Sequence, residues 1–147
     1  MNDIYSVLIK IDLLLNELTD ILVDEEKELS RFKVNAITLQ SLADKRHQVI
    51  TAIHFYDRQR YQLEREKTFS PPYSHSSELA DSWKTITKKI RQTAELHERI
   101  HFLIERQMQN IKSFQTVIHE LQEQHFIYES GGDKEVTSPT PFYHISV

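Results

Sequence analysis

His97, Glu98 and His101 have the residue types and the spacing of a zinc-peptidase motif. On a helix, two histidines four residues apart lie on one face and can share a metal ion, while the glutamate beside them can act as a base. Two more carboxylates, Glu120 and Glu123, follow where some of these enzymes carry a third ligand. Metal-dependent hydrolysis is therefore a hypothesis to weigh against the elements that would position these residues.

The chain after His101 argues against that hypothesis. Residues 102–119 contain neither glycine nor proline and keep an apolar repeat without interruption, so Glu120 would lie about 28 Å farther along the same helix. His97 falls on the repeat, which predicts that it faces the interior of a helical bundle. We therefore predict no catalytic residue, no bound metal and no cofactor, with a zinc peptidase as a remote alternative.

The composition excludes several other classes of protein. The 147 residues suit a single domain and carry 18 Lys and Arg against 22 Asp and Glu, the wrong balance for binding nucleic acid. There is no cysteine, and the only glycines are Gly131 and Gly132, which excludes thiolate sites and Gly-rich phosphate loops before them. No apolar run is long enough to span a membrane, and no secretory signal is expected. We predict a cytoplasmic protein.

Apolar residues divide the rest of the chain into three long helices. They recur at alternating spacings of three and four within residues 3–33, 36–68 and 76–128, which is typical of bundle helices with coiled-coil character. The sequence therefore predicts an all-α antiparallel bundle of three long helices, forming one domain over residues 1–132. The Ser/Thr/Pro-rich residues 133–147 are predicted to form a flexible C-terminal tail.

The repeat also predicts which side chains are buried. In the first helix, one continuous row comprises Ile4, Leu8, Ile11, Leu15, Leu18, Leu22, Glu25, Leu29 and Phe32. In the third helix, the corresponding row begins with Leu79, Trp83, Ile86, Ile90, Thr93, His97, Ile100 and Ile104. Both rows are expected to face the interior of the bundle.

The third helix is predicted to be the longest and to end in an amphipathic overhang. The first two helices would each be about 45–50 Å long, and the third about 80 Å. If the third helix runs back along the second, it passes the end of the second helix near residue 108. About 20 later residues of the third helix would then have no partner in this chain. The overhang nevertheless keeps an apolar face, which predicts a partner-binding surface. Its predicted anchors are Ile111, Phe114, Val117, Ile118, Leu121, Phe126 and Tyr128.

Two alternatives remain for this segment. The helix could break near residues 107–110 and fold back as a fourth helix of the bundle. The apolar face could instead join two copies of the chain, making the protein a structural coiled-coil or homodimerising adaptor.

Four segments of the chain resemble the FlgN family of bacterial flagellar export chaperones. They are LLNELTDILVDEEKELSRF, LADKRHQVITAIHFYDRQR, LADSWKTI with Trp83, and the helix ending HFIYESGG. The resemblance extends over about residues 8 to 132. The family signature reads Tyr-Gly-x-x-Gly, whereas here Tyr128 is followed by Glu129 and only Gly132 matches a glycine.

The resemblance implies a function. Members of this family are short helical proteins whose amphipathic C-terminal region binds the terminal helix of hook-associated (hook-filament junction) proteins before export. The chain would then keep such a protein from assembling prematurely, and the region of Tyr128 would dock onto the membrane export gate. This implication agrees with the overhang inferred from helix lengths.

Overall fold

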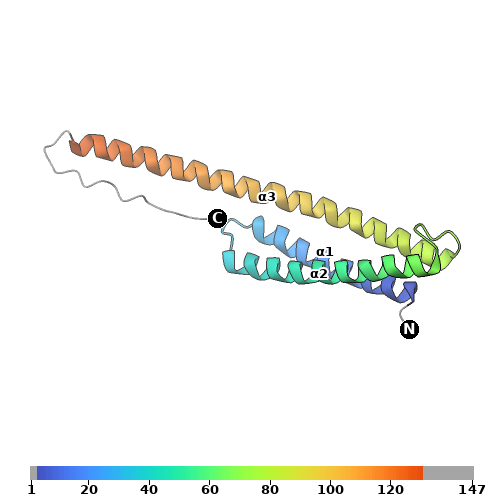
Figure 1. Ribbon diagram of the computed structural model, residues 1–147. Helices are drawn as coiled ribbons and strands as arrows, with labels where there is room; N and C mark the ends of the chain where they lie inside the picture. The colour runs from blue at the N-terminus through green and yellow to red at the C-terminus, as the bar shows by residue number, and fades with distance from the viewer. Residues whose placement is uncertain (1–2, 131–147) are drawn as a thin grey trace. The chain divides into compact units, whose positions relative to one another are not determined.

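The computed structural model describes residues 3–130, with side chains described up to residue 125. It contains three helices, α1 (Ile4–Leu29), α2 (Ala36–Lys67) and α3 (Ser77–Ser130), and no strand within the described residues (Figure 1). The all-α prediction is confirmed, and the third helix is the longest. The predicted flexible tail, residues 133–147, lies outside the described part.

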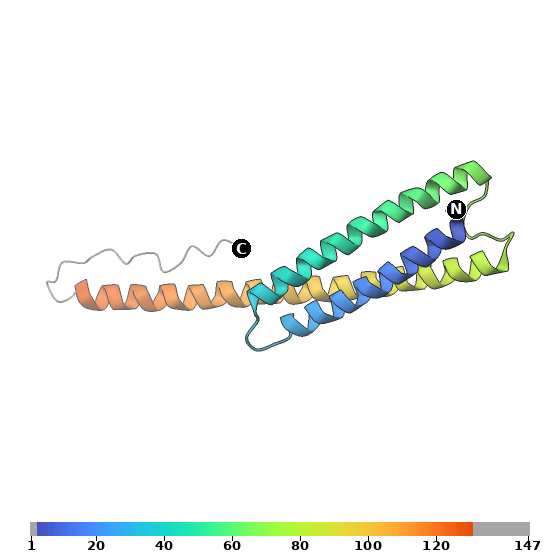
Figure 2. The same cartoon turned by 90° about the horizontal axis from the view of Figure 1, so that it is seen from below.

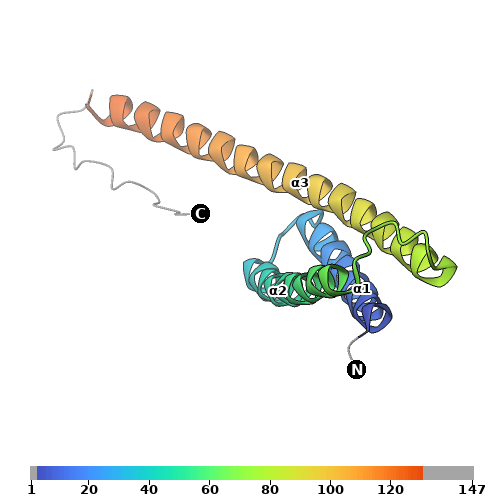
Figure 3. The same ribbon diagram turned by 45° about the vertical axis from the view of Figure 1, so that its right-hand side comes forward.

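The chain forms two units, residues 1–104 and residues 105–147. The first unit contains α1, α2 and the N-terminal half of α3. Here α1 and α2 pack against each other and run in opposite directions, joined by a short loop (Figure 2). The second unit contains the C-terminal part of α3. Figure 3 shows α3 as one continuous helix.

Side chains close to the helix ends explain where α1 and α2 begin. The Asp3 carboxylate accepts a hydrogen bond from the Ser6 amide at 2.7 Å. The Asn35 side chain accepts from the amides of Ile37 and Thr38 at 3.0 and 3.1 Å. Both are N-caps, which satisfy amides that have no partner inside the helix.

The first helix ends at Leu29, four residues before the predicted end at residue 33. The Glu28 carboxylate accepts from the Asn35 amide at 2.8 Å and pairs with Arg31 at 3.1 Å. These contacts hold the loop against the last turn and lower the pKa of Glu28. Phe32 was predicted to belong to the buried row, but it lies in this loop and is fully exposed.

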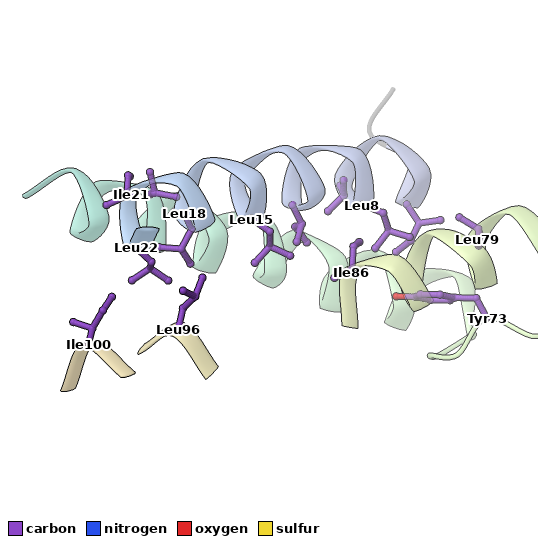
Figure 4. Packing of buried hydrophobic residues seen from close by; sticks show 14 of the residues in the cluster. Leu8, Leu15, Leu18, Ile21, Leu22, Tyr73, Leu79, Ile86, Leu96 and Ile100 are labelled. Atoms are coloured by element: carbon purple, nitrogen blue, oxygen red, sulfur yellow. The ribbon is translucent and has the colours of Figure 1, made fainter. Parts of the chain in front are cut away.

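The core is built mainly on α1. Every predicted position of its row from Ile4 to Leu29 is buried, and Val7 and Ile21 widen the row. Figure 4 shows Leu18 and Leu22 of α1 facing Leu96 and Ile100 of α3. Burying a large apolar side chain stabilises by about 1.5–3 kcal/mol, so this row is the main source of stability in the first unit.

Three of the eight positions predicted for the buried row of α3 from Leu79 to Ile104 are wrong. Ile90, His97 and Ile104 are exposed, whereas Leu96 is buried and Leu103 is half-buried. The α3 sequence carries apolar residues on both sides of the row Leu79, Ile86, Thr93 and Ile100. Periodicity alone did not decide which side would face α1.

A buried polar cluster joins α2 to the loop that precedes α3. Arg60 donates to Glu64 at 2.6 Å and to Asp57 at 2.8 Å, and its guanidinium lies 4.7 Å from the Trp83 ring centre. The fully buried Tyr73 donates its hydroxyl hydrogen to Glu64. Burial, followed by this hydrogen bond, raises the pKa of Tyr73 to about 12. The cluster holds the loop against α2 and Trp83.

Truncation of Leu8 is expected to destabilise the protein strongly. Leu8 is 0% exposed, whereas Leu13 on the same helix is 58% exposed. Leu8→Ala should lower the free energy of unfolding by about 2–5 kcal/mol because it leaves a cavity. Leu13→Ala, the matched control, should change it by about 0.5 kcal/mol or less. Denaturant unfolding followed by circular dichroism measures both, and equal effects would contradict the packing described for α1.

Candidate partner-binding surface

α3 continues without a break through residues 107–110 and on to Ser130. The alternative in which the chain breaks there and folds back as a fourth helix is therefore wrong. No glycine or proline interrupts this part of the sequence. Regular backbone hydrogen bonding consequently extends through the whole predicted partner-binding segment.

Four of the predicted anchors are exposed. Ile111 is 38% exposed, Phe114 66%, Val117 50% and Leu121 58%, while Ile118 is half-buried. We call these five residues the α3 stripe. Their spacings of three, three, one and three place them on one side of the helix. An exposed apolar surface of this kind marks an interaction site more often than a solvated face.

The sequence analysis missed one residue that extends the stripe. Met108 is 37% exposed and lies three residues before Ile111 on the same helix. Its position three residues before Ile111 could have indicated that it belongs to the same apolar side of the helix. A methionine side chain is flexible and adapts to different partners. Phe126 and Tyr128 lie on the described backbone of α3, but their side chains lie outside the described part.

The zinc-peptidase motif does not assemble a metal site in the part of the chain described. Glu98, His101 and His97 are all exposed, which corrects the prediction that His97 faces the interior. Leu96 occupies the buried position instead. No group of three or more His, Asp or Glu side chains among the residues described could hold a metal ion.

The possible third ligands of that motif have another arrangement. The Glu123 carboxylate lies 3.1 Å from the His119 imidazole, one turn away on the same helix, and both side chains are largely exposed. Exposed pairs of this kind contribute little to stability. Glu120 is exposed as well.

A buried carboxylate in the first unit has an unusual environment. Glu25 of α1 is 3% exposed and pairs with Arg46 of α2 at 2.6 Å. Its second oxygen, Oε1, is buried and has no hydrogen-bond partner among the described residues. Burial raises the pKa of Glu25, and the nearby Arg46 and, to a smaller extent, His97 oppose the rise. Ionisation of Glu25 therefore weakens the folded state.

A helical bundle that exposes an apolar stripe on a long helix defines a class of helical binding proteins. The chain matches the family model described as FlgN protein over residues 1–135 and belongs to the FlgN family. This confirms the resemblance seen in the sequence. Comparisons with curated proteins and with solved structures found no match.

Family membership indicates a flagellar export chaperone in general, since FlgN is a chaperone family and not an enzyme family. Among the described helices, none has the length and apolarity needed to cross a membrane.

Replacing Glu25 by glutamine should remove a pH dependence of stability. The pKa of Glu25 is raised in the folded state above its usual value of 4.5, so the folded state holds the proton more tightly than the unfolded state. The contribution of Glu25 to the stability of the folded state is therefore complete at low pH, and it is lost as the pH rises through the raised pKa. The stability of the wild type relative to Glu25→Gln should fall over the range of pH above 4.5, the usual pKa of the carboxyl. Thermal unfolding across that range measures it, and a constant difference would contradict the altered pKa.

The protein should contain no stoichiometric zinc after dialysis. The helix continues straight through the residues that would have to turn back to bring a third ligand to His97 and His101. Elemental analysis of the purified chain tests this expectation. About one zinc per chain, lost in His97→Ala, would show that a metal site forms.

Proposed function

We propose that the chain is a cytoplasmic chaperone of flagellar type III protein export. It binds the C-terminal helix of hook-associated (hook-filament junction) proteins, prevents their premature assembly and delivers them to the export gate. The observation that carries this proposal is the exposed α3 stripe in a chain of the FlgN family.

The mode of binding follows from the geometry of α3. A helix with one apolar side recognises another amphipathic helix by pairing with it or by lying in its groove. The partner would cover Ile111, Phe114, Val117, Ile118 and Leu121, each of which gains about 1.5–3 kcal/mol when fully buried. Ordering of the partner offsets part of this gain. We propose Phe126 as a further anchor and the region of Tyr128 as the contact with the export gate.

The same stripe also supports a second candidate, a homodimerising adaptor. Two copies of an apolar helical face can pair as in a coiled coil. The free protein would then sediment as a dimer, and substitutions in the stripe would make it monomeric. A chaperone that forms such a dimer when free would exchange the second copy for its substrate.

Phe114→Ala should separate binding from stability. Phe114 is exposed in the free protein, so the free energy of unfolding should change by about 0.5 kcal/mol or less. Removal of a central aromatic anchor should weaken binding of a hook-associated protein from the same host by about 2 kcal/mol or more, or about 30-fold. Isothermal titration calorimetry measures the affinity, and thermal unfolding measures the stability.

The matched control for Phe114→Ala is Phe55→Ala. Phe55 lies on α2 and is exposed to a similar degree, so this variant should bind like the wild type. Normal binding by Phe114→Ala would remove this residue from the anchors. A loss of several kcal/mol in the free monomer would show that the stripe is packed within the chain itself.

A further inference from the structure

The N-terminal half of α1 is apolar on two sides. Its inner side forms the core described above. Its outer side carries Tyr5, Ile9 and Leu13, which are 38%, 41% and 58% exposed. These three residues are spaced by four, so they form a row about half a turn from the core row. A helix that is apolar around most of its circumference is usually covered on more than one side, yet among the described residues Tyr5, Ile9 and Leu13 stay exposed.

The same outer side becomes acidic farther along α1. Glu17, Asp20 and Asp24 are exposed and follow one another at spacings of three and four. No hydrogen bond or ion pair within the described residues involves their carboxylates. Like charges at these spacings repel each other and destabilise a helix by about 0.2–0.5 kcal/mol per pair. The acidic row therefore opposes folding slightly, and a cationic partner would relieve it.

The other acids of α1 behave differently. Asp12 pairs with Lys89 of α3 at 2.6 Å, and Glu26 pairs with Arg99 of α3 at 3.0 Å. Glu25 pairs with Arg46 of α2. Acids on the sides that face α2 and α3 are thus matched by cations of this chain, whereas those of the outer side are not.

We propose that the outer side of α1 binds an amphipathic basic helix of another protein. Apolar residues of that helix cover Tyr5, Ile9 and Leu13, and its Lys or Arg side chains lie against Glu17, Asp20 and Asp24. The complementary surface is a straight strip about 28 Å long, or about five turns, which matches the shape of a helix. It is separate from the α3 stripe, and the proposal does not depend on the proposed function.

The charges favour this occupant over two others. An anionic membrane or a nucleic acid would be repelled by the acidic row. A second copy of α1 fits poorly in either direction. Parallel pairing places acidic rows opposite each other, and full-length antiparallel pairing places apolar residues opposite carboxylates.

A synthetic helical peptide can test the proposal with the full chain. The probe has about 25 residues, with leucines along one half of one face and lysines along the other half of that face. In the control peptide, glutamate replaces every lysine. Fluorescence anisotropy should show binding of the lysine peptide at least about tenfold tighter than binding of the glutamate peptide. The affinity should also fall as salt is added.

Two double variants locate the binding surface. Ile9→Gln with Leu13→Gln, and Asp20→Lys with Asp24→Lys, should each weaken binding of the lysine peptide by about tenfold or more. The second variant should instead prefer the glutamate peptide, a reversal that misfolding cannot produce. Glu66→Lys, at an exposed position of α2, serves as the control and should bind like the wild type. Phe114→Ala on α3 reports any peptide that binds at the α3 stripe instead.

Three outcomes would overturn the proposal. Both peptides could bind equally, the α1 variants could bind the lysine peptide like the wild type, or binding could be lost only in Phe114→Ala. Sedimentation of the free chain tests the remaining alternative, that a second copy of the chain occupies this surface. A dimer of the free chain that Ile9→Gln with Leu13→Gln dissociates would assign the outer side of α1 to a second copy.

Discussion

The first unit depends on the row of buried side chains along α1. Among the described residues, α1 supplies most of the buried apolar side chains of the unit, whereas α2 contributes only Val49 to that set. Ion pairs at its edges then set the position of the neighbours, with Arg46 of α2 on Glu25 and Lys89 of α3 on Asp12. Apolar burial holds the helices together, and the charged pairs favour one register over others.

The parts of the fold that local chemistry determines could be predicted from the sequence. From Ile4 to Leu29 the α1 row was predicted correctly because only one side of that helix keeps the repeat along its whole length. The end of α1 was not, because the contact between Glu28 and the Asn35 amide joins residues seven positions apart. In α3, His97 was predicted to be buried, but Leu96 is the buried residue. Apolar residues lie on both sides of the central row of α3, and only the position of α1 decides which side is buried.

The two candidate surfaces also differ in whether the sequence could predict them. Exposure of Phe114 and Leu121 was predictable because α3 has 54 residues, and neither α1, with 26, nor α2, with 32, is long enough to match it. The outer side of α1 was not predicted, because Tyr5, Ile9 and Leu13 simply add to the apolar content of a helix already assigned to the core. Their exposure depends on which sides α2 and α3 leave open, and the sequence does not state that. A helix that is apolar on opposite sides was the available signal.

The two surfaces use different physical forces, which has a consequence for how they respond to conditions. The α3 stripe is apolar, and the ion pair between His119 and Glu123 on the same helix is exposed and weak. Binding there should depend on buried area and give a negative heat-capacity change. The outer side of α1 combines a small apolar row with unmatched carboxylates, so salt should weaken its interactions much more. If both surfaces bind partners as proposed, the chain should keep a partner on the α3 stripe under ionic conditions that release one from α1.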